Sequence, residues 1–148
     1  MDLFQSLQIS ASGLQSQRTV IGVIAENMAN AQTTRTEEGG PYLRKRAVLS
    51  SAPVAGGSPF FELLASKKGP EAQGVQVQEI VQDPEGVKAI HDPSHPDADE
   101  NGLLHLPNVN MMEEMVALMA ASRVFEANVA AFNAAKMMTL KSLEIGNR

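Results

Sequence analysis

Apolar side chains recur every three or four positions over residues 2–30, which is the spacing of one face of an α-helix. Part of this stripe forms a seven-residue repeat, the spacing of a coiled-coil contact, at Leu7, Leu14, Ile21 and Met28. Arg18 interrupts the wider stripe, and Gly13 and Gly22 each weaken a helix by about 1 kcal/mol relative to alanine. The pattern therefore predicts a long N-terminal helix that is marginal alone or is approached closely by another backbone at the glycines.

A second helical pattern runs from Asn110 to about Ile145. Asn110 can cap the first turn, and Glu113 follows three residues later, as in a capping box. Its predicted core seam reads Met111, Met115, Leu118, Ser122, Phe125, Val129 and Phe132. Because other apolar residues lie on the remaining faces, this helix needs several neighbours to cover it.

The segment between the two helices is rich in glycine and proline, which favours loops and short strands. Residues 42–49, 60–65 and 74–81 are the strand candidates, the last because Val75 and Val77 alternate with glutamines. The predicted fold is mainly α with a small β insertion, in which the terminal helices pair as a coiled coil. The predicted division places the N-terminal helix at 1–32, the β insertion at 33–107 and the C-terminal helix at 108–148, with the two helices forming a core domain.

Composition narrows the functional classes. The formal charge of -5 argues against a phosphate backbone as the main ligand, and the absence of cysteine excludes a disulfide framework or a thiolate nucleophile. The first residues, MDLFQSLQIS, lack the basic and apolar regions of a Sec signal peptide. The most apolar uncharged stretch, 115–122, is far shorter than the ~20 residues that span a bilayer, so no transmembrane helix is expected.

All histidines of the chain lie in or just after the polar stretch 91–102. Asp97, Asp99 and Asn101 match the opening of a calcium loop, but the position that should hold a bidentate glutamate is Asn108. His91 and His95 could ligate zinc, yet intervening prolines disfavour one shared helical face. A solvated turn is the favoured interpretation, and neither a metal nor a cofactor is expected.

Other arrangements give no catalytic site. Ser94 and His95 are adjacent in sequence, so their side chains diverge and do not form a dyad. Glu113 and Glu114 are better explained by helix capping than by paired acid catalysis. The basic run 44–46 is interpreted as a solvated strand edge or a contact with an acidic partner, such as the acidic stretch 97–100 of a neighbouring copy.

Both terminal segments resemble one protein family. Residues 10–33, SASGLQSQRTVIGVIAENMANAQT, resemble the N-terminal motif of the flagellar axial proteins of rod and hook. The matching positions are Ser10, Ser12, Gly13, Leu14, Asn27, Ala29, Asn30 and Thr33. The C-terminal segment resembles the partner motif at Val109, Asn110, Glu114, Met115, residues 121–123, Phe125 and Asn128. The stretch DPSHPDADENG and the short length are similar to the basal-body rod members, in particular to proximal rod subunits.

This resemblance implies a non-enzymatic structural subunit of the bacterial flagellar proximal rod. It implies that the chain assembles through its terminal helices with other copies of itself and with other rod proteins. It also implies export through the flagellar type III apparatus to the periplasmic rod, without a cleaved Sec signal and without a membrane span. The expected assembly interface consists of Leu7, Leu14, Ile21, Met28, Met115, Leu118, Phe125, Val129 and Phe132.

Three alternatives remain open. The first is another rod or hook-type protein, which should lack the DPSHPDADENG stretch. The second is a metal-dependent enzyme built on His91, His95 and Asp97, which would contain stoichiometric metal. The third is a soluble coiled-coil adaptor, which would stay a small oligomer in solution.

Overall fold

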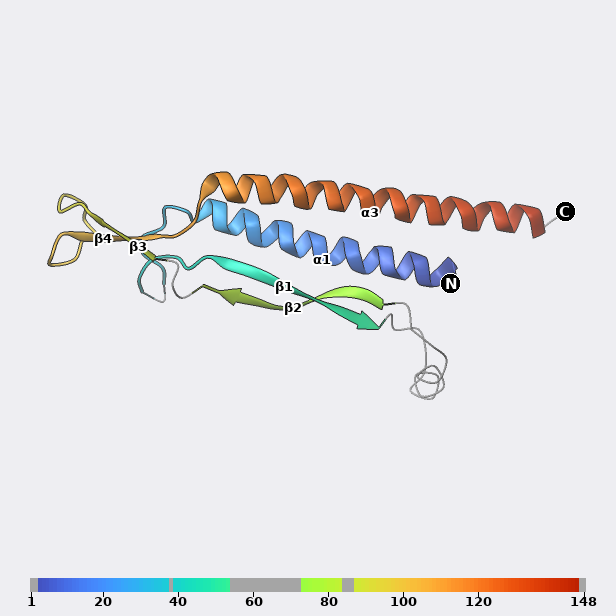
Figure 1. The fold of residues 1–148 in the computed structure, drawn as a ribbon, viewed down its shortest axis with the longest axis horizontal. Helices are drawn as coiled ribbons and strands as arrows, with labels where there is room; N and C mark the ends of the chain where they lie inside the picture. The colour runs from blue at the N-terminus through green and yellow to red at the C-terminus, as the bar shows by residue number, and fades with distance from the viewer. Residues whose placement is uncertain (1–2, 38, 54–72, 84–86, 147–148) are drawn as a thin grey trace. The chain divides into compact units, whose positions relative to one another are not determined.

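A computed structural model describes residues 3–37, 39–53, 73–83 and 87–146. Along the chain it places helix α1, strands β1 to β4 and helix α3, coloured from blue to red in Figure 1. The fold class is confirmed, because the chain is mainly helical with a small β part between its terminal helices.

Helix α1 spans Leu3–Ala29 and contains 27 residues, which confirms the helix predicted at 2–30. The chain turns away just after it, where Asn30 donates a side-chain hydrogen bond of 3.0 Å to the Glu26 carbonyl oxygen. Thr33 in turn donates its hydroxyl proton to Asn30 Oδ1 at 3.1 Å. These local side-chain bonds compete with further helical hydrogen bonds and thereby help to end the helix.

Helix α3 spans Met111–Gly146 and contains 36 residues, close to the predicted bounds. Asn110 caps it, since its Oδ1 accepts the backbone N–H of Met112 at 3.1 Å. Glu113 accepts a 3.0 Å hydrogen bond from the Asn110 side chain rather than from its backbone, so the predicted capping box exists in a variant form.

Two pairs of strands lie between the helices. Strand β1, Lys45–Pro53, pairs with β2, Gln73–Gln82, and these strands confirm the candidates at 42–49 and 74–81 with shifted bounds. Strand β3, Val87–His91, runs antiparallel to β4, Leu103–Pro107. Sequence analysis did not predict this second pair, because histidine, proline and aspartate dominate the pattern around it. The candidate strand at 60–65 lies outside the described residues.

The chain divides into two compact units. The first consists of Met1–Arg18, Leu49–Gln78 and Ser122–Arg148, and the second of Thr19–Val48 and Glu79–Ala121. Each unit therefore combines a piece of α1, a piece of α3 and strand residues. The division of the sequence at 1–32, 33–107 and 108–148 describes the order of elements and stays a prediction.

The second unit has the larger core. Its buried apolar residues are Val23, Ile24, Tyr42, Leu104 and Ala121, which come from both helices, the loop before β1 and strand β4. Two polar side chains, Asn27 and Glu114, are 2% and 1% exposed. Because a buried polar group without a partner is costly, the hydrogen bonds of these two residues decide whether the unit is stable.

The first unit holds α1 to its neighbours through small polar side chains. Ser12 accepts the backbone N–H of Val75 at 3.2 Å, and Ser16 donates to the Val75 carbonyl oxygen at 2.9 Å. A Cβ atom added at Gly13 would lie 3.1 Å from Asn128 Nδ2, so α1 and α3 are close here. Gly13 is thus explained by a side chain, rather than by the backbone that the sequence led us to expect.

Candidate assembly surface and polar cluster

The predicted interface residues lie on both helices and are only partly covered. On α1, Leu7, Leu14, Ile21 and Met28 are half-buried. On α3, Leu118, Phe125 and Phe132 are half-buried, while Met115 and Val129 are 37% and 36% exposed. The seam therefore retains apolar surface for contact with another molecule, and its role in assembly stays a prediction.

Other residues of α3 are more exposed than this seam. Large apolar side chains with at least 47% exposure lie along the whole helix: Met112, Val116, Met119, Val124, Met137, Met138, Leu140, Leu143 and Ile145. Sequence analysis expected apolar residues on several faces of this helix but did not assign these residues to the interface. An apolar surface of this extent marks a contact with protein or lipid.

Helix α3 is also long and apolar enough, by length and composition alone, to cross a membrane. Only 6% of the most apolar 18-residue segment of α3 is buried. The expectation of no such helix was too strict, because isolated charges such as Arg123 and Glu126 interrupt the apolar run without lowering its average hydropathy much. Composition does not show whether the neighbour of α3 is lipid or protein. The known proteins that this chain resembles are needed to distinguish these two possibilities.

A polar cluster joins three separate parts of the second unit: α1, the start of β1 and the start of α3. It consists of Asn27, Tyr42, Arg44, Lys45 and Glu114. The Asn27 amide bonds both backbone groups of Lys45, donating to its carbonyl oxygen and accepting from its N–H, each at 2.9 Å. Asn27 Oδ1 also accepts the Tyr42 hydroxyl at 2.9 Å, and Asn27 Nδ2 donates to Glu114 Oε2 at 3.2 Å.

Glu114 completes this cluster from the first turn of α3. Its Oε1 accepts a 2.8 Å hydrogen bond from Arg44 Nε and lies 2.6 Å from the terminal guanidinium nitrogen. Glu114 lies in the first turn of α3, as predicted, but its carboxylate is buried against Arg44, a contact that the capping interpretation did not include. In the described part of the chain no buried side-chain nitrogen or oxygen lacks a hydrogen bond, so the cluster is fully satisfied.

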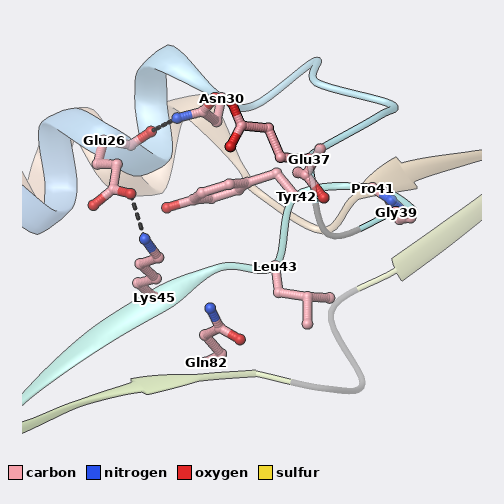
Figure 2. Close-up of a pocket in the computed structure, with 10 residues that line it drawn as sticks. Glu26, Asn30, Glu37, Gly39, Pro41, Tyr42, Leu43, Lys45 and Gln82 are labelled. Atoms are coloured by element: carbon pink, nitrogen blue, oxygen red, sulfur yellow. Dashed lines mark hydrogen bonds and ion pairs between the residues drawn. The ribbon is translucent and has the colours of Figure 1, made fainter.

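Lys45 is also paired within the chain, where it forms an ion pair with Glu26 and lies 5.7 Å above the ring of Tyr42. Figure 2 shows Lys45 reaching from β1 toward Glu26 on α1, beside the Tyr42 ring. Two members of the basic run 44–46 thus contact acids of their own chain, and Arg46 stays exposed. The solvated strand edge predicted for this run applies only to Arg46.

Tyr42 has a clearly displaced pKa. Burial raises the pKa of Tyr42 to about 12, and the negative charges of Glu26 and Glu114 act in the same direction. A phenol with such a pKa stays protonated near neutral pH and acts as a hydrogen-bond donor, as it does toward Asn27. It is therefore a structural group and not a general base.

A pocket of about 320 Å³ lies beside Tyr42, between the end of α1, the loop 36–43 and the paired strands. Its polar lining includes Glu26, Asn30 and Gln82, and its apolar lining includes Pro41 and Leu43. None of the described residues that line it is a histidine or serine, its lysine and one of its glutamates are paired with each other, and the Thr36 hydroxyl donates to the Gly40 carbonyl oxygen. The one described hydroxyl of a threonine in the pocket thus donates to the backbone and not to a side-chain base, which gives no support to a catalytic nucleophile here.

The polar stretch 91–102 forms a turn between β3 and β4. His105 pairs with Asp99 at 2.8 Å, whereas His95 Nδ1 accepts the backbone N–H of Asp97 at 3.1 Å. Asp97 Oδ2 accepts the hydroxyl of Thr34 at 2.8 Å. These side chains point to different partners, and within the described ranges no three such groups come together to hold a metal ion.

The polar cluster as a unit was not predictable from the local pattern of the sequence. Asn27 and Glu114 both matched the family motifs, which was the one available signal, but no local pattern shows that residues so far apart in the sequence share a hydrogen bond. Arg44 gave only the signal of the basic run 44–46, for which a contact with an acidic partner was one interpretation, and Tyr42 gave none, because an aromatic residue before a strand is ordinary.

Comparison with known proteins gives one consistent family. A family model described as the C-terminal part of the flagellar basal body rod FlgEFG proteins matches residues 100–145, which includes β4 and nearly all of α3. The chain is 40% identical to the flagellar basal-body rod protein FlgC of Borreliella burgdorferi, over 98% of both chains. It is 40% identical to FlgC of Bacillus subtilis and 34% identical to FlgC of Salmonella typhimurium, over 99% of each chain. The similarity therefore includes both helices and the strands between them.

Proposed function

This chain belongs to the family of the flagellar basal-body rod protein FlgC, and we propose on that premise that it is a structural subunit of the proximal rod. The observation that carries this function is the similarity to FlgC proteins over nearly the whole chain. The family is a family of structural flagellar proteins, so the chain serves bacterial motility and is not an enzyme. The metal-dependent enzyme built on His91, His95 and Asp97 has no support from these relatives.

The apolar surface of α3 supports assembly with other subunits. One neighbouring helix covers only one face of a helix, whereas the exposed apolar residues of α3 lie along its whole length and on several faces. In a rod each subunit is surrounded by several others, which provides that cover. We expect the predicted seam of both helices and the more exposed residues of α3 to contact other copies and other rod proteins. Contact with these neighbouring subunits explains why α3 is apolar on several faces, and a membrane is not needed to explain it.

The chain is a component of the flagellar basal body. Within the basal body we propose the periplasmic section of the rod, reached through the flagellar type III export apparatus. The similarity to rod proteins supports this place. The formal charge of -5 is also consistent with a protein that has no nucleic-acid partner.

The test is complementation of a strain that lacks its own copy of this protein. We expect the chain to restore motility and to be recovered in purified basal bodies. Absence from basal bodies, together with a soluble small oligomer in the cytoplasm, would favour the coiled-coil adaptor instead. Stoichiometric metal in the purified chain would favour the enzyme.

A further inference from the structure

Arg18 is the one charged residue of α1 between Phe4 and Ala25. Its side chain is exposed, and it makes no hydrogen bond or ion pair with any residue that the structure describes. The positions one turn away on the helix are Leu14, Gln15, Ile21 and Gly22, so no carboxylate lies near it on α1. Within its own helix, Arg18 has no partner to offset its charge.

On α3, Glu126 is likewise a charged residue without a partner among the described residues. The other acids of this helix are engaged: Glu113 with Asn110, Glu114 with Arg44, and Glu144 with Lys141. Glu126 is exposed and, among the described residues, has no such partner. On the described parts of the two helices it is thus the one carboxylate without a partner, since Glu26 of α1 pairs with Lys45.

Both charges lie beside apolar surface that we expect to lose water on assembly. Val124 and Val129 flank Glu126 on α3 and are 49% and 36% exposed. A charge that is desolvated without an opposite charge is strongly unfavourable, whereas a close pair across an interface fixes orientation and register. Arg123, one turn before Glu126, forms no ion pair with it in the structure, although the spacing allows one.

We propose that Arg18 of one subunit forms an ion pair with Glu126 of a neighbouring copy, and that this pair sets the register between the two copies. The proposal rests on the proposed function, because it needs a neighbour of the same kind. It commits to a second copy because Arg18 and Glu126 are both described and do not pair within one chain, so α3 of another copy has to supply the carboxylate. Repeated in every copy, the pair would connect α1 of each subunit to α3 of the next.

A charge-swap experiment in the complemented strain tests this pair. Arg18→Glu alone and Glu126→Arg alone should each lower the amount of protein in purified basal bodies by about tenfold or more. The double variant should restore incorporation. Two single variants expressed together should also restore it, because each supplies the charge that the other lacks. Circular dichroism of each variant should match the unmodified chain, since both side chains are exposed.

The other outcomes separate the explanations. Normal incorporation of either single variant would overturn the pair and leave the proposed function intact. Rescue by the double variant without rescue by co-expression would place the pair within one copy. Rescue of Glu126→Arg by Arg123→Glu instead of Arg18→Glu would show that the partner is misassigned. Arg35→Glu, an exposed and unpaired arginine outside the helices, is the matched control and should incorporate normally. Failure of the unmodified chain to enter basal bodies would overturn the proposed function, and this pair with it.

Discussion

The two units of the chain are stabilised in different ways. The unit of Thr19–Val48 and Glu79–Ala121 buries apolar residues around a satisfied polar cluster at Asn27 and Glu114. In the unit of Met1–Arg18, Leu49–Gln78 and Ser122–Arg148, the described core contains a single buried apolar residue, Ala135. The same unit exposes Leu143 and Ile145 at 66% and 77%.

This difference indicates which unit depends on other subunits. A buried and fully hydrogen-bonded cluster favours a single structure, because the loss of any one partner leaves a buried polar group without a hydrogen bond. A helix that is apolar on several faces and poorly covered gains stability mainly from neighbours. We therefore expect the unit with the polar cluster to fold in the isolated chain, and the helical ends of the other unit to be completed by assembly.

The largest expected effect is on assembly. Phe125→Asp should abolish motility and incorporation into the rod, because Phe125 is half-buried on α3 and a buried unpaired carboxylate adds to the loss of the ring, itself worth about 3–5 kcal/mol. The amount of mutant protein in basal bodies and outside the inner membrane is the measurement. Asn133→Asp, on an exposed position of the same helix, is the control and should assemble. Motile cells carrying Phe125→Asp would refute the predicted seam.

The second prediction breaks the polar cluster. Glu114→Ala should destabilise its unit by about 3 kcal/mol, because Arg44 and Asn27 lose their shared partner in a buried site. Urea unfolding of the isolated chain, followed by hydrogen exchange of the backbone amides in residues 23–27, measures the loss. Glu113→Ala, which removes only an exposed contact with Asn110, should cost less than about 1 kcal/mol. Equal effects of the two variants would contradict the special role of Glu114.

The third prediction concerns alkaline pH. The pKa of Tyr42 is raised from 10.0 to about 12, so the folded chain keeps a proton that the unfolded chain releases. The associated stability is complete below pH 10 and is lost as the pH rises toward 12, by at most about 3 kcal/mol in all, because one pKa unit corresponds to about 1.4 kcal/mol.

Tyr42 is the sole tyrosine of a chain without tryptophan, so tyrosinate absorbance reports on it directly. We expect its titration midpoint to lie clearly above that of a free tyrosine. The Tyr42→Phe variant should show no matching alkaline step in its stability. A midpoint near 10 in the folded chain would show that Tyr42 is not buried as described.

The smallest expected effect is at Gly22. A Cβ atom there would meet nothing within 4 Å, so Gly22→Ala should stabilise the isolated chain by about 0.5–1 kcal/mol through helix propensity. The matched variant Gly13→Ala should gain less, because its Cβ would press against the Asn128 side chain at 3.1 Å. Thermal unfolding of both variants under one set of conditions makes the comparison. A loss of stability at Gly22 would mean that a neighbouring group already occupies that space.

The helices could be predicted well from the sequence, and the polar cluster could not. The apolar spacing in residues 2–30 and the cap at Asn110 are local signals, and both gave helix bounds close to those observed. Strands β3 and β4 were missed because their pairing brings His91 opposite Leu103 across a polar turn that looked like loop. Pairing between distant residues has no local signature.

Glu114 shows the same limit for side chains. A glutamate in the first turn of a helix is normally explained by its interaction with the helix dipole. Only the folded chain shows that Glu114 is buried against Arg44. The sequence did predict that α3 exposes apolar residues, because it has more of them than one neighbouring helix can cover. Which residues remain uncovered depended on how α1 and the strands pack.

We expect the apolar surface of α3 to be covered when the chain enters the rod. The chain has no cysteine, so a single Met138→Cys substitution provides a unique thiol on this surface, where Met138 is 56% exposed. We predict rapid maleimide labelling of the isolated chain and strong protection in purified basal bodies that remain assembled. Equal labelling in both states, in a variant that still supports motility, would contradict the claim.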